Sequence, residues 1–132
     1  MRVLAIDYGS ARTGLAISDP TGTVARPLGV VVRAGTGDGL AELARVIGVE
    51  EVEQVVVGLP LTMRGERGLQ AGETERFVEA LRDVTSVPVE TFDERFTTDL
   101  AERDRAARAP TDALAAAHLL TSYLEWSSAG RR

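Results

Sequence analysis

Four carboxylates stand at positions in this sequence where they could do chemistry together: Asp7, Asp93, Glu94 and Asp112. Asp7 closes one apolar run, the adjacent pair Asp93 and Glu94 closes another, and Asp112 follows Pro110 and Thr111 at a predicted helix start. In open α/β sheets the functional crevice lies at the carboxyl ends of the strands, and a helix that returns after the last strand begins near that edge. The carboxylates are therefore expected to converge.

Converging carboxylates repel one another and stay ionised together when a cation lies between them. The chain has no cysteine and only one histidine, His118, which we expect to be an ordinary helix residue. An oxygen-only ligand set favours Mg²⁺ or Mn²⁺, and such ions activate water for phosphodiester cleavage. The ordinary alternative is that a strand-end Asp is a turn residue and a first-turn Asp caps its helix.

Side chains alternate along a strand, so Asp93 and Glu94 cannot both face the site. Glu94 would share the face of Phe92, and the residues alone leave open which face holds the site. Asp19 is expected at the opposite end of a hairpin from Asp7, roughly 20 Å away. We therefore interpret Asp19, which precedes Pro20, as a turn residue.

The elements that must position these residues follow from hydrophobic spacing. Apolar runs predict five strands, over 2–7, 13–18, about 28–32, 54–57 and 88–92. Helical spacing predicts one helix around 40–47 that is capped by Gly48, a second around 77–84, and a third from Asp112 to about Trp126. Residues 61–70 are expected to form a mobile loop, 99–109 a short helix or a loop, and 127–132 a frayed tail.

Short connections join the first three strands, which predicts an antiparallel meander, and helices separate the later strands, which predicts parallel pairing. The expected fold is α/β, a mixed five-stranded sheet with helices on its faces, in a single domain over 1–132. The apolar runs are too short to span a membrane, so we expect a soluble, cytoplasmic protein.

The net charge of -5 does not by itself indicate a nucleic-acid binder. All fifteen basic residues are arginines, however, and arginine binds phosphate through two parallel hydrogen bonds. Arg12, Arg64, Arg67 and Arg95 follow the predicted strand ends, so we expect a local positive rim that contacts about two to four phosphates.

Four blocks resemble the YqgF/RuvX family of Holliday junction resolvase-like proteins, which are also described as pre-16S rRNA nucleases. They are DYGSARTG over 7–14, VVGLPL over 56–61, FDERFTT over 92–98 and DALAA over 112–116. These are similar to the family's D-x-G-[ST]-x-[RK]-x-G, V-V-G-L-P-L, [VF]-D-E-R-[LF]-T-T and D-x-x-A-A. Together the blocks span nearly the whole chain in the family's order.

The resemblance implies an RNase H-like fold and a metal-dependent nuclease in which Asp7, Glu94 and Asp112 hold Mg²⁺ or Mn²⁺. It favours Glu94 over Asp93, and it implies a role in maturing the 5′ end of pre-16S rRNA, with branched or single-stranded DNA as further substrates. One segment departs from the family: residues 99–110 are short and nearly neutral, where the family usually has a longer basic stretch.

Two other functions fit the sequence less closely. A non-catalytic nucleic-acid-binding module of ribosome assembly would bind without cleaving. An actin-like nucleotide-binding phosphotransferase would share the Asp7–Gly14 turn, but that class needs two lobes and 132 residues hold one. Metal-dependent cleavage by the purified protein separates the nuclease from both.

Overall fold

The computed structural model describes residues 1–61, 68–93 and 112–130. The strands are β1 (Val3–Asp7), β2 (Arg12–Ser18), β3 (Ala25–Val32), β4 (Gln54–Leu59) and β5 (Val89–Asp93), and the helices are α1 (Gly37–Val49), α2 (Leu69–Arg82) and α4 (Asp112–Gly130). Glu94, Arg95, Arg64, Arg67 and the 99–110 segment lie outside these residues, so the expectations placed on them stay predictions.

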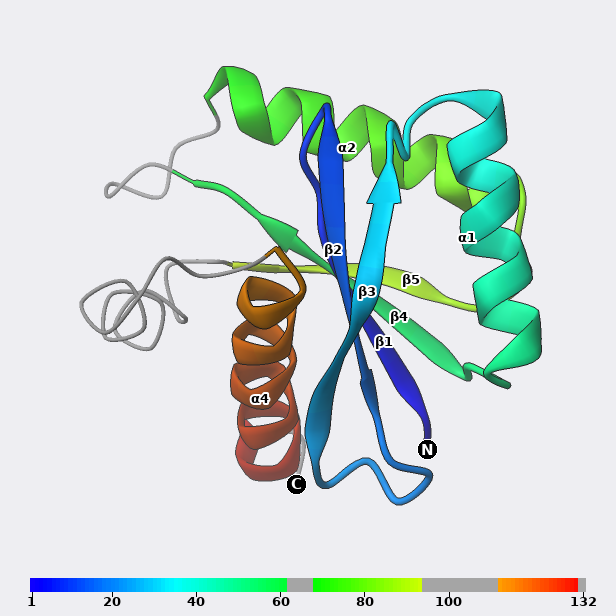
Figure 1. The fold of residues 1–132 in the computed structure, drawn as a ribbon. Helices are drawn as coiled ribbons and strands as arrows, with labels where there is room; N and C mark the ends of the chain where they lie inside the picture. The colour runs from blue at the N-terminus through cyan, green and yellow to red at the C-terminus, as the bar shows by residue number, and fades with distance from the viewer. Residues whose placement is uncertain (62–67, 94–111, 131–132) are drawn as a thin grey trace.

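The five strands form one mixed sheet, as the connection lengths predict, and their order in it is β3-β2-β1-β4-β5 (Figure 1). The pairs β1–β2 and β2–β3 are antiparallel. The pairs β1–β4 and β4–β5 are parallel, so β1, β4 and β5 all end at the same edge of the sheet. Asp7 and Asp93 are the last residues of β1 and β5 and lie at that edge.

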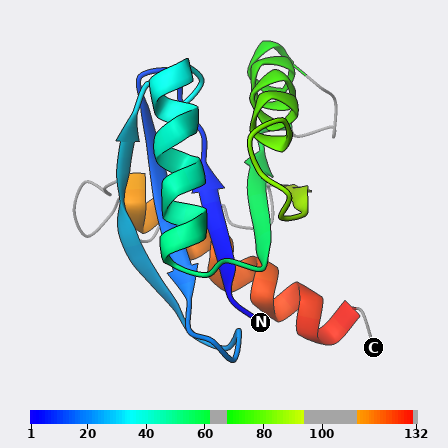
Figure 2. The same ribbon diagram turned by 90° about the vertical axis from the view of Figure 1, so that its right-hand side faces the viewer.

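Helices cover both faces of the sheet, with α1 in front of it and α4 behind it in Figure 2. On one face, Leu4 and Ile6 of β1 pack with α1 and α2 in a buried apolar cluster. On the other face, Val3 and Ala5 pack against α4. Because consecutive strand residues point to opposite faces, both faces of β1 are apolar, and this explains the continuous run that precedes Asp7.

The first helix is longer than the spacing of its apolar residues predicts. Its N-cap is Thr36, whose hydroxyl accepts a hydrogen bond from the Gly39 amide at 3.2 Å. The prediction that Gly48 caps its C-terminus is wrong, because Gly48 lies inside the helix and Glu50 is the C-cap. The left-handed conformation that usually selects glycine is taken by Glu51, with φ 54°.

Other boundaries also differ from the prediction. Helix α2 begins at Leu69, inside the segment predicted as a loop, because its first turns bury Ala71 and Thr74, which carry little hydrophobic signal. Helix α4 continues to Gly130 rather than ending near Trp126, whose ring packs 5.6 Å from that of Phe92. In the described part of the chain, no helix is long and apolar enough to cross a membrane.

Candidate active site

Asp7 faces the same side of the sheet as α4. Val3 and Ala5 lie on that side, and alternation along β1 brings Asp7 to it as well. In the β1–β2 ladder Asp7 stands directly opposite Gly14. Facing residues of an antiparallel pair have Cα atoms about 4.5–5.5 Å apart, so Gly14 lies within one strand spacing of the Asp7 backbone.

Gly14 allows the first turn of α4 to rest on the sheet. A Cβ atom added to Gly14 would lie 1.9 Å from the carbonyl oxygen of Asp112, a separation that no side chain could occupy. The missing side chain therefore brings the start of α4 next to Asp7. The end of β1 and the start of α4 thus lie close together, although they are far apart in the chain.

Arg12 contacts the second of these carboxylates. Its Nε atom lies 2.8 Å from an Asp112 carboxylate oxygen, and both side chains are substantially exposed, at 64% and 41%. Arg12 is the first residue of β2 and lies on the α4 face two positions before Gly14. The sequence predicts phosphate contacts for Arg12, and in the structure its guanidinium is held beside a candidate metal ligand.

Asp93 lies farther away and faces the other way. It pairs with Leu59 on β4, so one strand separates β5 from β1. Phe92 packs in the apolar cluster under α4, and alternation then turns Asp93 toward the α1 and α2 face. Asp93 is therefore not brought together with Asp7 and Asp112 on one face.

The turn between β1 and β2 is held by a buried threonine. The Thr13 hydroxyl donates to the Gly9 carbonyl at 3.1 Å and accepts from the Gly9 amide at 3.3 Å. A Cβ atom on Gly9 would come within 2.4 Å of the Arg12 carbonyl, so the turn is too tight for a larger residue. These contacts fix the segment that follows Asp7.

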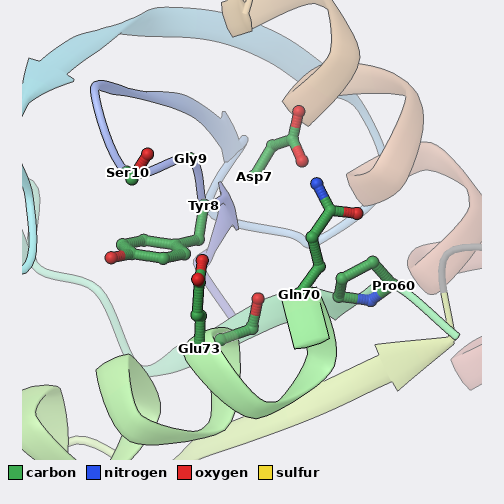
Figure 3. Close-up of a pocket in the computed structure, with 8 residues that line it drawn as sticks. Asp7, Tyr8, Gly9, Ser10, Pro60, Gln70 and Glu73 are labelled. Atoms are coloured by element: carbon green, nitrogen blue, oxygen red, sulfur yellow. The ribbon is translucent and has the colours of Figure 1, made fainter. Parts of the chain in front are cut away.

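A cavity of about 200 Å³ opens beside Asp7 at the carboxyl edge of the sheet. Figure 3 shows the Gln70 amide pointing from the first turn of α2 toward Asp7, while Glu73 points into the same cavity near Tyr8. Sequence reasoning did not identify Tyr8, Gln70 or Glu73 as site residues. Gln70 fell within residues 61–70, which the sequence predicts as a loop, so hydrophobic spacing gave no signal for it.

Asp19 has the turn role that the sequence predicts. Its carboxylate accepts hydrogen bonds from the amides of Thr23 and Val24, at 2.7 and 2.9 Å, and from the Thr21 hydroxyl. The Thr21 hydroxyl, followed by these amides, holds the pKa of Asp19 well below its usual value. Asp19 lies between β2 and β3, at the opposite end of β2 from the Asp7–Gly14 pair.

The donors present suit a hard divalent cation. Asp7 and Asp112 supply carboxylate oxygens, and Mg²⁺ is commonly held by one or two carboxylates with water or phosphate oxygens in its other positions. Within residues 1–61, 68–93 and 112–130 no group of three or more acidic, histidine or cysteine side chains could hold an ion. The described residues alone therefore do not form a complete metal site.

Comparisons with known proteins place this chain in a family. The family model described as "RuvX: Holliday junction resolvase" matches residues 1–126. The chain belongs to the RuvX family. A Chloroflexus aggregans relative named "Putative pre-16S rRNA nuclease" is 40% identical over 131 residues, which cover 93% of this chain and 92% of the relative. An Anaeromyxobacter relative of the same name is 42% identical, covering 95% of this chain and 97% of the relative.

Solved structures confirm the RNase H-like fold that the resemblance implies. The RuvC protein of T. thermophilus, in complex with a Holliday junction substrate, superposes with a TM-score of 0.71 at 20% identity, covering 98% of this chain and 96% of that one. The fowlpox virus Holliday junction resolvase has a TM-score of 0.54 at 15% identity, covering 95% and 99%. The family is one of nucleases, which hydrolyse phosphodiester bonds, and this activity is what the sequence predicts.

Proposed function

We propose that this protein is a divalent-metal-dependent nuclease that trims the 5′ end of pre-16S rRNA in the cytoplasm. The observation that carries the proposal is the meeting of Asp7 with the first turn of α4 across Gly14. It brings the backbone at the start of α4 close to β1, whose last residue, Asp7, lines the cavity at this edge of the sheet. The names of the relatives, which span nearly the whole chain, support the RNA substrate.

We assign Asp7, Glu94 and Asp112 as the residues that hold Mg²⁺ or Mn²⁺. Bound there, the cation would lower the pKa of a water and neutralise charge on the scissile phosphate. The orientation of Asp93 toward the other face of the sheet supports Glu94 as the member of the pair that serves the site. Arg12 would then have two alternative partners. Substrate phosphate would compete with Asp112 for Arg12, and a bound cation would compete with Arg12 for Asp112.

We propose that Arg64, Arg67 and Arg95 bind the substrate backbone together with Arg12. Each carries a charge that can pair with phosphate, and the chain as a whole is acidic, so binding depends on where these few arginines lie. Branched DNA is a second candidate substrate. The description of the matching family as a Holliday junction resolvase favours it.

The test is a cleavage assay with purified protein on four labelled substrates. These are a 16S precursor RNA with its 5′ leader, an unrelated single-stranded RNA, single-stranded DNA and a four-way DNA junction. Each is incubated with Mg²⁺, with Mn²⁺ and with EDTA. We expect cleavage near the mature 5′ end of the precursor, with metal only. Preferential cleavage of the junction would transfer the assignment to DNA, and binding without cleavage of any substrate would favour the ribosome-assembly module.

A further inference from the structure

Three hollows in the surface meet at Tyr8 and Ser10, next to the proposed active site. The first is the cavity beside Asp7. The second lies over α2 and is lined by Glu73 and Arg76. The third lies over the connection between β3 and α1 and is lined by Arg33 and Thr36. Because Tyr8 and Ser10 line all three, the hollows adjoin one another, and together we call them the Tyr8 groove.

The two arginines of the Tyr8 groove differ from most others. Seven arginines fall in the described residues, and four of them form ion pairs with carboxylates: Arg2, Arg12, Arg45 and Arg82. Arg33 and Arg76 have no ion pair with any described carboxylate, and both side chains are exposed. On a chain with net charge -5, these two exposed arginines without carboxylate partners concentrate positive charge in one groove and are available to pair with an anion.

Tyr8 forms the rigid wall of this groove. Its ring stacks on Phe77 with centroids 4.3 Å apart and planes inclined by 17°, and Phe77 is almost fully buried. A Cβ atom on Gly35 would lie 3.1 Å from the Tyr8 hydroxyl, so a side chain at position 35 would crowd this ring. The Tyr8 ring is therefore half-buried, and its stacking on the buried Phe77 ring fixes its position.

An aromatic wall beside unpaired arginines suits a nucleic acid whose bases are not already paired. Single-stranded binding sites combine a positive groove for the phosphates with aromatic rings for the bases. In a duplex the bases are stacked on one another and present only their edges. Glu73 repels phosphate, so a base or sugar would pass over it while the phosphates follow Arg33 and Arg76.

We propose that the Tyr8 groove guides the single-stranded segment next to the cleaved phosphate, from the Asp7 cavity across Tyr8 to Arg33 and Arg76. This inference rests on the proposed nuclease function and adds the path of the substrate. It also adds phosphate contacts to those assigned to Arg12, Arg64, Arg67 and Arg95. Arg33 and Arg76 would bind phosphates away from the reacting bond, so they are positioning residues.

The experiment measures binding of a fluorescein-labelled 12-nucleotide oligouridine, in EDTA, at salt concentrations from 50 to 200 mM. The variant is Arg33→Ala/Arg76→Ala. The matched control is Arg26→Ala, because Arg26 is also exposed and has no ion pair among the described residues but lies outside the groove, on β3. Losing two phosphate contacts should make the slope of log K against log salt shallower by about 1.4. Arg26→Ala should leave the slope unchanged.

A Tyr8 series tests the aromatic wall. Tyr8→Leu should weaken oligouridine binding about tenfold at 100 mM salt, by analogy with loss of one stacked base, and Tyr8→Phe should retain affinity. A melting curve checks that each variant folds, and if Tyr8→Leu does not fold, the arginine pair still decides. A 12-base-pair RNA duplex should bind more weakly than the single strand.

Three results would each reject the proposal that the Tyr8 groove binds the single strand. They are an unchanged salt slope in Arg33→Ala/Arg76→Ala, an equal loss in Arg26→Ala, and tighter binding of the duplex than of the single strand. These outcomes are distinguishable from failure of the proposed function, because binding is measured without metal and cleavage with it. Cleavage by the wild type with an unaffected double variant rejects the groove alone, and groove-dependent binding without any cleavage rejects the nuclease alone.

Discussion

Arg12 forms an ion pair with Asp112, one of the residues that we propose to hold the cation. The Arg12 Nε atom lies 2.8 Å from an Asp112 carboxylate oxygen, so the guanidinium offsets the charge of that carboxylate. Both side chains are well exposed, and exposed ion pairs contribute only about 0–1 kcal/mol to stability. A divalent cation or a substrate phosphate can therefore displace this contact at little cost to the fold.

The first prediction compares Asp93, the last residue of β5, with Glu94, the next residue in the sequence. We expect Glu94→Gln to lower the cleavage rate by about 100-fold, a cost typical of losing one electrostatic group in an active site. Asp93→Asn should change it by less than about tenfold, because Asp93 turns toward the face opposite Asp7. Both rates are measured with the same RNA at saturating Mg²⁺. The reverse ranking would mean that Asp93 is the ligand.

At the scale of elements, the packing of α4 on β2 decides whether the site forms. Helix α4 begins directly over Gly14, which pairs with Asp7, and any side chain at Gly14 would overlap the Asp112 carbonyl. Helix α4 is otherwise fixed on the sheet by buried residues such as Leu119 and Leu120. A disturbance at Gly14 should therefore shift the first turn of the helix and leave the rest of it in place.

Replacing Gly14 tests this contact. We expect Gly14→Ala to cost about 1–3 kcal/mol of unfolding free energy, as overpacking does. Cleavage should fall by about 100-fold, because displacing a catalytic group by about 1 Å can cost that much. The control is Gly29→Ala on β3, where an added Cβ meets nothing within 4 Å. Equal behaviour of the two variants in urea unfolding and cleavage would show that α4 does not depend on Gly14.

Asp19, in the turn between β2 and β3, should make the stability of the protein depend on pH. The folded-state pKa of Asp19 lies below its usual value of about 3.9, so its contribution to stability is present above that pH and is lost as pH falls through the folded pKa. Asp19→Asn should therefore melt at a lower temperature than wild type at pH 7. The gap should begin to narrow as the pH falls below about 3.9 and should keep narrowing toward the folded-state pKa. A gap that stays constant between pH 7 and pH 2 would show that the Asp19 charge does not stabilise the turn.

At the scale of the whole molecule, most of the architecture could be predicted from the chain. Connection lengths and apolar runs were enough for the mixed sheet and its strand directions. The ends of helices were harder to predict from the sequence where weakly hydrophobic residues are buried. Ala71 and Thr74 are buried in α2 without an apolar signal, and Glu51 adopts a positive φ that the sequence assigns to Gly48.

The site could be predicted only in part for the same kind of reason. Asp7 and Asp112 stand at an end of a strand and of a helix, and topology brings such ends to one edge. Tyr8, Gln70 and Glu73 line one cavity because α2 begins earlier than expected and its first turns face the end of β1 there. Their meeting depends on packing between elements, which residue spacing does not encode.

The central claim is that Asp7 helps to hold a catalytic cation, and the most direct test is the cleavage rate of 16S precursor RNA as a function of Mg²⁺ concentration. We predict that Asp7→Asn melts like the wild type but cleaves about 100- to 1000-fold more slowly at saturating Mg²⁺. Asp83→Asn, at an exposed acid just beyond α2, should cleave like the wild type. A folded Asp7→Asn variant with the wild-type rate and the wild-type Mg²⁺ dependence would contradict the account.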